Sequence, residues 1–135
     1  MSIEKSFKDE HGTVIRVKIN RSNIELTGND SEEPYFSLKE SSDLLKFIIT
    51  GAYAVWKSFK PKEADSMGSD YYEFYDRKSY CNGYLSVNSQ GLDFDRGYLN
   101  GETDLWYRFN KAKCQSFIYD VFKFFPGLKV LEKTK

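Results

Sequence analysis

The residues that could do chemistry in this chain are few and lie apart. A catalytic nucleophile needs a nearby base and a third group that orients the base. The one histidine, His11, instead lies beside carboxylates in the turn-forming run Asp9–Gly12. No Gly-x-Ser-x-Gly motif occurs, and no glycine-rich run precedes a helix pattern as phosphate binding would require. The sequence therefore predicts no catalytic residue, no cofactor and no enzymatic activity.

Carboxylates gather in two short acidic sets, which are the candidates for holding a hard cation. They are Asp93 with Asp95, and Glu102 with Asp104. Alternating carboxylates on a strand point into solvent and more often display charge than enclose a metal. Cys81 and Cys114 lack the spacing of metal ligands. We expect no metal site and two reduced, partly buried thiols.

The composition indicates one domain with more aromatic residues than its core requires. Aromatic residues make up 17% of the 135 residues, more than one core of this size normally needs, so some rings should be exposed. Lys plus Arg equals Asp plus Glu at 20 each, which gives no overall field toward nucleic acid or an anionic membrane. No signal-peptide run and no stretch of roughly 18 apolar residues occurs. We expect a single soluble, cytoplasmic domain over residues 1–135.

The spacing of apolar residues predicts strands and two helices. Ile15, Val17 and Ile19 alternate with polar neighbours, as in a sheet with one buried face. The same alternation recurs over 84–88 and 92–95. Apolar doublets four residues apart, over 44–49 and 117–122, predict one buried stripe on each of two helices.

Candidate capping residues and one glycine also bear on these helices. Ser41 or Ser42 is the predicted N-cap of the first helix, and Asn110 that of the second, because their side chains can accept a bond from an unpaired backbone N–H. Gly51 inside the first helix predicts close packing or a kink.

The predicted elements occur twice in the same order. Four strands and a helix over about 1–59 are followed by a polar surface connection over about 60–70, and then by four strands and a helix over about 71–135. The sequence therefore predicts an α+β fold of two ββββα repeats, with curved antiparallel sheets packed together with two helices.

This repeated ββββα unit resembles the Whirly and PUR-alpha families of single-stranded nucleic-acid-binding proteins. The resemblance rests on element order and covers nearly the whole chain. It implies two curved antiparallel sheets packed with their helices into one domain, with nucleic acid bound on the outer sheet surface. Scaffolds of similar shape also look like those of some small bacterial immunity proteins, which neutralise a toxin by covering its active site.

Exposed rings beside mixed charges favour a protein-binding surface, because Tyr, Trp and Arg anchor the centres of interfaces. The candidate partner-binding residues are Tyr84, Trp106, Arg108, Asp93, Asp95, Glu102 and Asp104. Against a nuclease toxin the acids could mimic substrate phosphates; alternatively, they only keep the protein soluble. A one-residue slip in register would bury Trp106 and expose Tyr107 instead.

Single-stranded DNA or RNA is the alternative partner, because rings can stack on bases while Lys and Arg follow the backbone. The candidate residues for it are Arg16, Lys18, Tyr35, Tyr84, Trp106 and Arg108. Glu25, Asp93 and Asp95 are predicted on the same polar faces, where they would repel phosphates. A third possibility is a structural subunit that self-associates through an edge strand.

Overall fold

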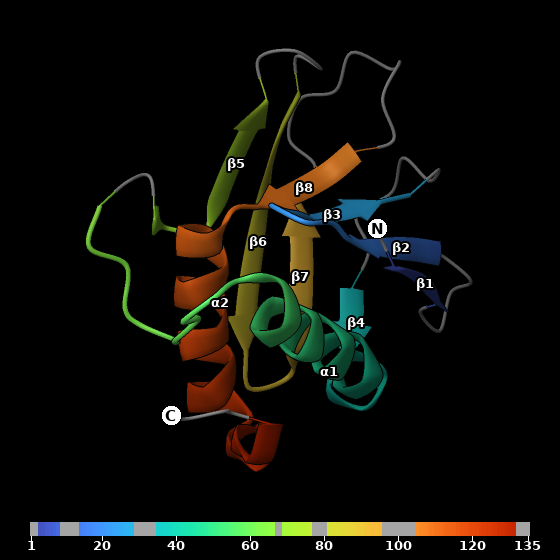
Figure 1. The fold of residues 1–135 in the computed structure, drawn as a ribbon. Coiled ribbons are helices and arrows are strands. Elements are labelled where there is room, and N and C mark those ends of the chain that lie inside the picture. Colours follow the sequence, from blue (N-terminus) through green and yellow to red (C-terminus); the bar gives the residue numbers. More distant parts are fainter. Residues whose placement is uncertain are drawn as a thin grey trace.

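The protein has a mixed α+β fold, as predicted (Figure 1). The computed structural model describes residues 3–8, 14–28, 35–66, 69–76, 81–95 and 105–131. The elements in chain order are β1 (Ile3–Lys8), β2 (Val14–Ile19), β3 (Ile24–Thr27), β4 (Tyr35–Ser37), α1 (Leu38–Val55), β5 (Glu73–Asp76), β6 (Cys81–Asn88), β7 (Gly91–Asp95), β8 (Leu105–Phe109), α2 (Lys111–Phe124) and the 3-10 helix η2 (Pro126–Leu131).

The strands form two antiparallel sheets of four. The first sheet has the order β1-β2-β3-β8 and the second has the order β4-β7-β6-β5. The two sheets therefore exchange their fourth strands. Strand β4 does not join β1–β3 but pairs with β7, where Phe36 lies opposite Leu92. Strand β8 does not join β5–β7 but pairs with β3, where Tyr107 lies opposite Leu26. The two sheets have matching strand orders: β1, β2, β3 and β8 of the first correspond to β5, β6, β7 and β4 of the second.

Both helices lie on one side of the strands and cover the inner faces of the sheets (Figure 1). Helix α1 contacts β2, β4 and β7, and α2 contacts β6 and β8, so the two sheets share one core. The alternating residues of β2 that were predicted to face inward are at most 3% exposed. The predicted helix stripes are also buried, namely Leu44, Leu45, Ile48, Ile49, Phe117, Ile118, Val121 and Phe122.

The start of α1 differs from the prediction, whereas that of α2 confirms it. Helix α1 begins at Leu38, directly after β4, so the predicted cap at Ser41 or Ser42 is wrong and Ser41 is buried within the helix. Good helix formers at 38–40 let the helix begin one turn earlier. In α2 the Lys113 backbone N–H donates to Asn110 Oδ1 over 2.7 Å, as an N-cap requires.

The close packing predicted at Gly51 is confirmed. An added Cβ there would lie 2.6 Å from Cδ1 of Ile19 on β2 and 2.9 Å from its Cγ1. Helix α1 continues past this position to Val55. Glycine therefore lets the helix backbone approach the first sheet closely.

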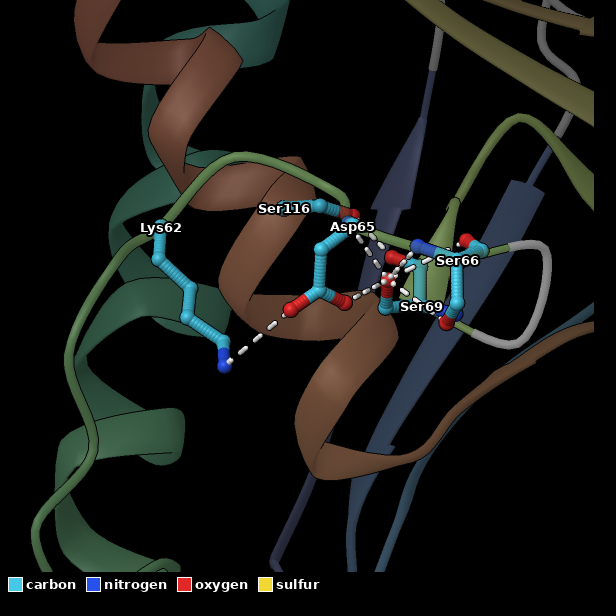
Figure 2. Close-up of polar contacts among 5 residues, drawn as sticks. All are labelled: Lys62, Asp65, Ser66, Ser69 and Ser116. Carbon is cyan, nitrogen blue, oxygen red and sulfur yellow. Dashed lines mark hydrogen bonds and ion pairs between the residues drawn. The ribbon is translucent and has the colours of Figure 1, made fainter.

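The connection between α1 and β5 is fastened to α2 by hydroxyl groups (Figure 2). Ser69 Oγ accepts hydrogen bonds from the backbone N–H groups of Asp65 (3.0 Å) and Ser66 (3.1 Å), and lies 3.1 Å from Asp65 Oδ1. Ser116 Oγ on α2 donates to the Ser69 carbonyl oxygen over 2.6 Å. The predicted polar segment thus has local structure of its own in the part that is described.

No helix in the described part of the chain is long and apolar enough to cross a membrane.

Candidate functional site

The outer face of the first sheet carries a row of alternating charge, one residue from each strand. Glu4 on β1 is opposite Lys18 on β2, Lys18 is opposite Glu25 on β3, and Glu25 is opposite Arg108 on β8. We call Glu4, Lys18, Glu25 and Arg108 the charged row. The strand neighbours of Lys18, Glu25 and Arg108 include the buried Val17, Leu26, Tyr107 and Phe109, which places these three on the side away from the helices. Glu4 shares this face because it lies directly opposite Lys18.

The strongest contact in the charged row joins Arg108 to Glu25. Glu25 Oε2 lies 2.9 Å from both Nε and Nη2 of Arg108. The other carboxylate oxygen, Oε1, accepts a 3.3 Å hydrogen bond from Asn20 Nδ2. Both side chains are partly exposed, at 39% for Arg108 and 21% for Glu25. The guanidinium is therefore held by an acid on its own face.

Arg16 lies in the adjoining row of the same face and also has an acidic neighbour. Its Nε is 4.0 Å from Glu4 Oε2 and 3.5 Å from Thr27 Oγ1. Lys18 is exposed, with Glu4 and Glu25 at its two register positions. The structure thus brings together three of the predicted nucleic-acid-binding residues, Arg16, Lys18 and Arg108, but sets each beside a glutamate.

Other predicted residues gather on the second sheet. Tyr84 on β6 is half-buried and lies opposite Asp95 on β7, while Asp93 is exposed and lies opposite Tyr35 on β4. Asn88 Nδ2 donates to Asp93 Oδ2 over 3.0 Å. The predicted partner-binding set is therefore divided: Tyr84, Asp93 and Asp95 belong to the second sheet, and Trp106 and Arg108 to β8 of the first.

Tyr72 is a surface ring that the sequence analysis missed. It is 54% exposed, and its ring centroid lies 5.4 Å from that of Tyr84. An Asp70 side chain accepts a 3.0 Å hydrogen bond from the Tyr72 backbone N–H, which fixes the turn before β5. The doublet Tyr71–Tyr72 could have indicated an exposed ring, because adjacent residues tend to face opposite ways. In the structure Tyr71 is the buried one of the two.

Several predicted positions lie outside the described structure. His11, Glu102 and Asp104 are outside the described residues, as are the side chains of Tyr35, Cys81, Asp95 and Trp106.

Tyr107 and Cys114 are buried, which excludes one alternative and corrects one expectation. Tyr107 is 1% exposed, so the alternative register that would expose it is wrong; β8 turns Tyr107 and Phe109 into the core, where the Tyr107 hydroxyl donates to the Tyr71 carbonyl oxygen. Cys114 is fully buried, not partly buried as predicted. Burial raises the pKa of both groups, which keeps the thiol protonated and unreactive.

Two hollows lie on the helix side, away from the sheet residues just described. One of about 360 Å³ is lined by Pro61, Tyr119, Phe122, Lys123 and Lys129, and one of about 380 Å³ by residues 53–59. Among the residues that the structure describes, no group of three or more His, Cys, Asp or Glu side chains is arranged to hold a metal ion.

Comparison with known protein families gave no matching family, and neither the curated proteins nor the solved structures gave a match.

Proposed function

We propose that this protein is a non-enzymatic binding module that docks on another protein through the outer faces of its sheets. The observation that carries the proposal is the pairing of charges on the first sheet, above all the two 2.9 Å contacts of Arg108 with Glu25. A surface whose Lys and Arg side chains already have acidic neighbours suits a protein partner of mixed charge better than a polyanion.

Nucleic acid would have to compete with these glutamates. Non-specific affinity for DNA or RNA comes mainly from Lys and Arg groups that neutralise phosphates. Arg108 would have to leave Glu25, and phosphates near Arg16 or Lys18 would approach Glu4 or Glu25. A protein partner can instead place its own acids and bases in register with the charged row.

The second sheet offers the apolar part of such an interface. The contacting rings of Tyr72 and Tyr84 present aromatic surface, and exposed Asp93 adds a negative group to the same sheet. Aromatic anchors beside charged groups are typical of interface centres. An immunity or inhibitor-type role follows: in the cytoplasm, the acids of β7 would cover the basic active site of a nuclease toxin.

Single-stranded DNA or RNA binding is the second candidate, favoured by the exposed ring of Tyr72 beside Tyr84. This candidate also agrees with the Whirly and PUR-alpha resemblance. We propose in addition that the chain consists of two ββββα repeats; the matching strand orders of the two sheets support this.

A photo-crosslinking amino acid at Tyr84 tests for the partner in cells that make the protein. The matched control carries the crosslinker at Tyr119, which is exposed on the helix side. We expect a discrete protein adduct from position 84 that survives nuclease treatment and is absent from position 119. With the captured partner purified, D93N/D95N should slow association more than it speeds dissociation. An adduct that nucleases remove would contradict the proposal.

Fluorescence anisotropy with a labelled oligothymidine of about 20 nucleotides tests the competing candidate. We expect the unmodified protein to bind no more tightly than about 10⁻⁴ M at physiological salt. The variant E4Q/E25Q should bind more tightly at low salt, because it releases Arg16 and Arg108 from their acidic neighbours. D93N, which removes one acid from the other sheet, is the control. Micromolar binding by the unmodified protein that weakens steeply with salt would favour nucleic acid instead.

A further inference from the structure

Strand β1 is an open edge of the first sheet. It pairs with β2 alone among the described strands. All its residues are exposed except Phe7, which is half-buried, and Ile3 is 59% exposed. The N–H and C=O groups on the outer side of such an edge can pair with a further strand.

The two faces of β1 differ in a way that restricts its pairing. Phe7 contacts Phe47 of α1, with ring centroids 5.9 Å apart, so alternation puts Ile3, Lys5 and Phe7 on the helix-covered face. Glu4, Ser6 and Lys8 belong to the outer face. If two copies pair antiparallel with their helices on the same side, opposite residues must come from the same face. One residue of β1 then lies directly opposite its own copy in the second chain, and the two-fold axis passes midway between these two copies.

Only one such register makes β1 complementary to itself. Centring on Glu4 or on Lys5 sets like charges directly opposite each other, which is unfavourable. Centring on Phe7 pairs only the last three residues of the strand. Centring on Ser6 places Glu4 opposite Lys8 twice and Lys5 opposite Phe7 twice. The second pairing repeats a contact present within the chain, where Lys5 Nζ lies 5.5 Å from the Phe7 ring centroid.

We propose that a second copy of this chain pairs with β1 in the register centred on Ser6. The two four-stranded first sheets would then join into one continuous sheet of eight strands. Lysines on an edge strand commonly prevent such pairing. Here the four-residue spacing of Glu4 and Lys8 makes the lysine select a register instead. This self-association uses the sheet edge and leaves the outer faces open, so it stands or falls independently of the proposed function.

Disulfide capture tests the register. In a background with Cys81 replaced by Ser, and with Cys114 buried, S6C should form a covalent dimer under mild oxidation. Directly opposed Cβ atoms in an antiparallel pair lie about 4.5–5.5 Å apart, close to the span of a disulfide. S89C, which puts a thiol in the exposed turn before β7, measures random collision. Equal crosslinking of S6C and S89C would overturn the proposed register.

A charge exchange tests the same pairing without a covalent bond. K8E should weaken the dimer about tenfold or more in sedimentation or light scattering, because it sets two carboxylates against each other twice. E4K should weaken it similarly, and E4K/K8E should restore the dimer to near the original dissociation constant. The double variant keeps the test valid if E4K loses stability with its Arg16 contact. A monomer at all concentrations, or a dimer that K8E leaves unchanged, would refute the proposal.

Discussion

Gly51 shows how one missing side chain sets the distance between a helix and a sheet. The positions that a Cβ would crowd include Cγ1 and Cγ2 of Ile19 as well as its Cδ1 tip, at 2.9, 3.1 and 2.6 Å. Ile19 is 3% exposed and branched at Cβ, so it has little freedom to turn aside. The intrinsic cost of glycine in a helix is thus offset by closer packing.

G51A should therefore destabilise the protein by about 1–3 kcal/mol, because overpacking outweighs the helix propensity gained. The variant I19V/G51A should be less destabilised than the sum of the two single changes, since valine removes the nearest atom. Urea unfolding of the four proteins in the cycle measures this coupling. If G51A raised the urea midpoint, the contact with Ile19 would not limit the approach of α1.

Residue-level prediction was definite where alternation was regular. In β8, where it was not, two registers stayed open, and the structure has the one with Arg108 outward and Tyr107 buried. Arg16 and Lys18 alternate with aliphatic residues, so their outer face could be predicted from sequence. In β8 nearly every residue is large and apolar or aromatic, and the facing of Tyr107 is fixed by its pairing with Leu26, next to a register shift at Leu26 and Thr27. The Arg108 contact with Glu25 could not be predicted either, because the two residues are brought together only by that pairing.

At the scale of elements, the connection before β5 shows what periodicity cannot reveal. Its polar composition predicts a surface connection, and among its described residues 60–66 belong to no helix or strand, whereas Ser69 lies in a short 3-10 segment. Its local order depends on one hydroxyl, that of Ser69, and on Ser116, which is distant in sequence. The Lys62 backbone N–H also donates to the Gln115 carbonyl oxygen over 3.2 Å. Such contacts form only when the tertiary fold brings these segments together, so the spacing of residues in the sequence does not predict them.

S69A should loosen this segment, because it leaves the backbone N–H groups of Asp65 and Ser66 without their acceptor. We expect a loss of about 1–3 kcal/mol in the free energy of unfolding. Faster hydrogen exchange at the Asp65 and Ser66 amides should accompany it. S89A, in an exposed turn, is the matched control and should change neither quantity. Unchanged exchange at these two amides in S69A would show that the hydroxyl does not hold the segment.

At the scale of the whole molecule, two buried tyrosine hydroxyls and one buried thiol make the free energy of unfolding fall at alkaline pH. Burial raises the pKa of Tyr71, Tyr107 and Cys114, and for Tyr71 the 2.7 Å hydrogen bond to Asp120 raises it further. The folded protein therefore keeps protons that the unfolded chain releases above the ordinary values of 9.0 for Cys and 10.0 for Tyr. Their contribution is complete below these values and declines as the pH rises above them.

The free energy of unfolding should accordingly fall above about pH 9, by about 1.4 kcal/mol per pH unit for each group that has become ionised in the unfolded chain. C114A should remove the earliest part of the decline, and Y71F should reduce the slope above about pH 10 by one proton. Urea unfolding across this range measures both effects. Y72F, which removes an exposed hydroxyl, is the control. A flat profile up to about pH 11 would contradict the burial of these groups.

The reciprocal placement of β4 and β8 has a consequence for how the chain becomes native. The first sheet lacks its fourth strand until β8 has left the ribosome, and β4 has no partner until β7 has been made. Neither sheet can therefore mature during translation of the residues before the connection. A nick in the connection would give two fragments that each carry a strand belonging to the other's sheet, so the pieces should regain structure only by complementing each other.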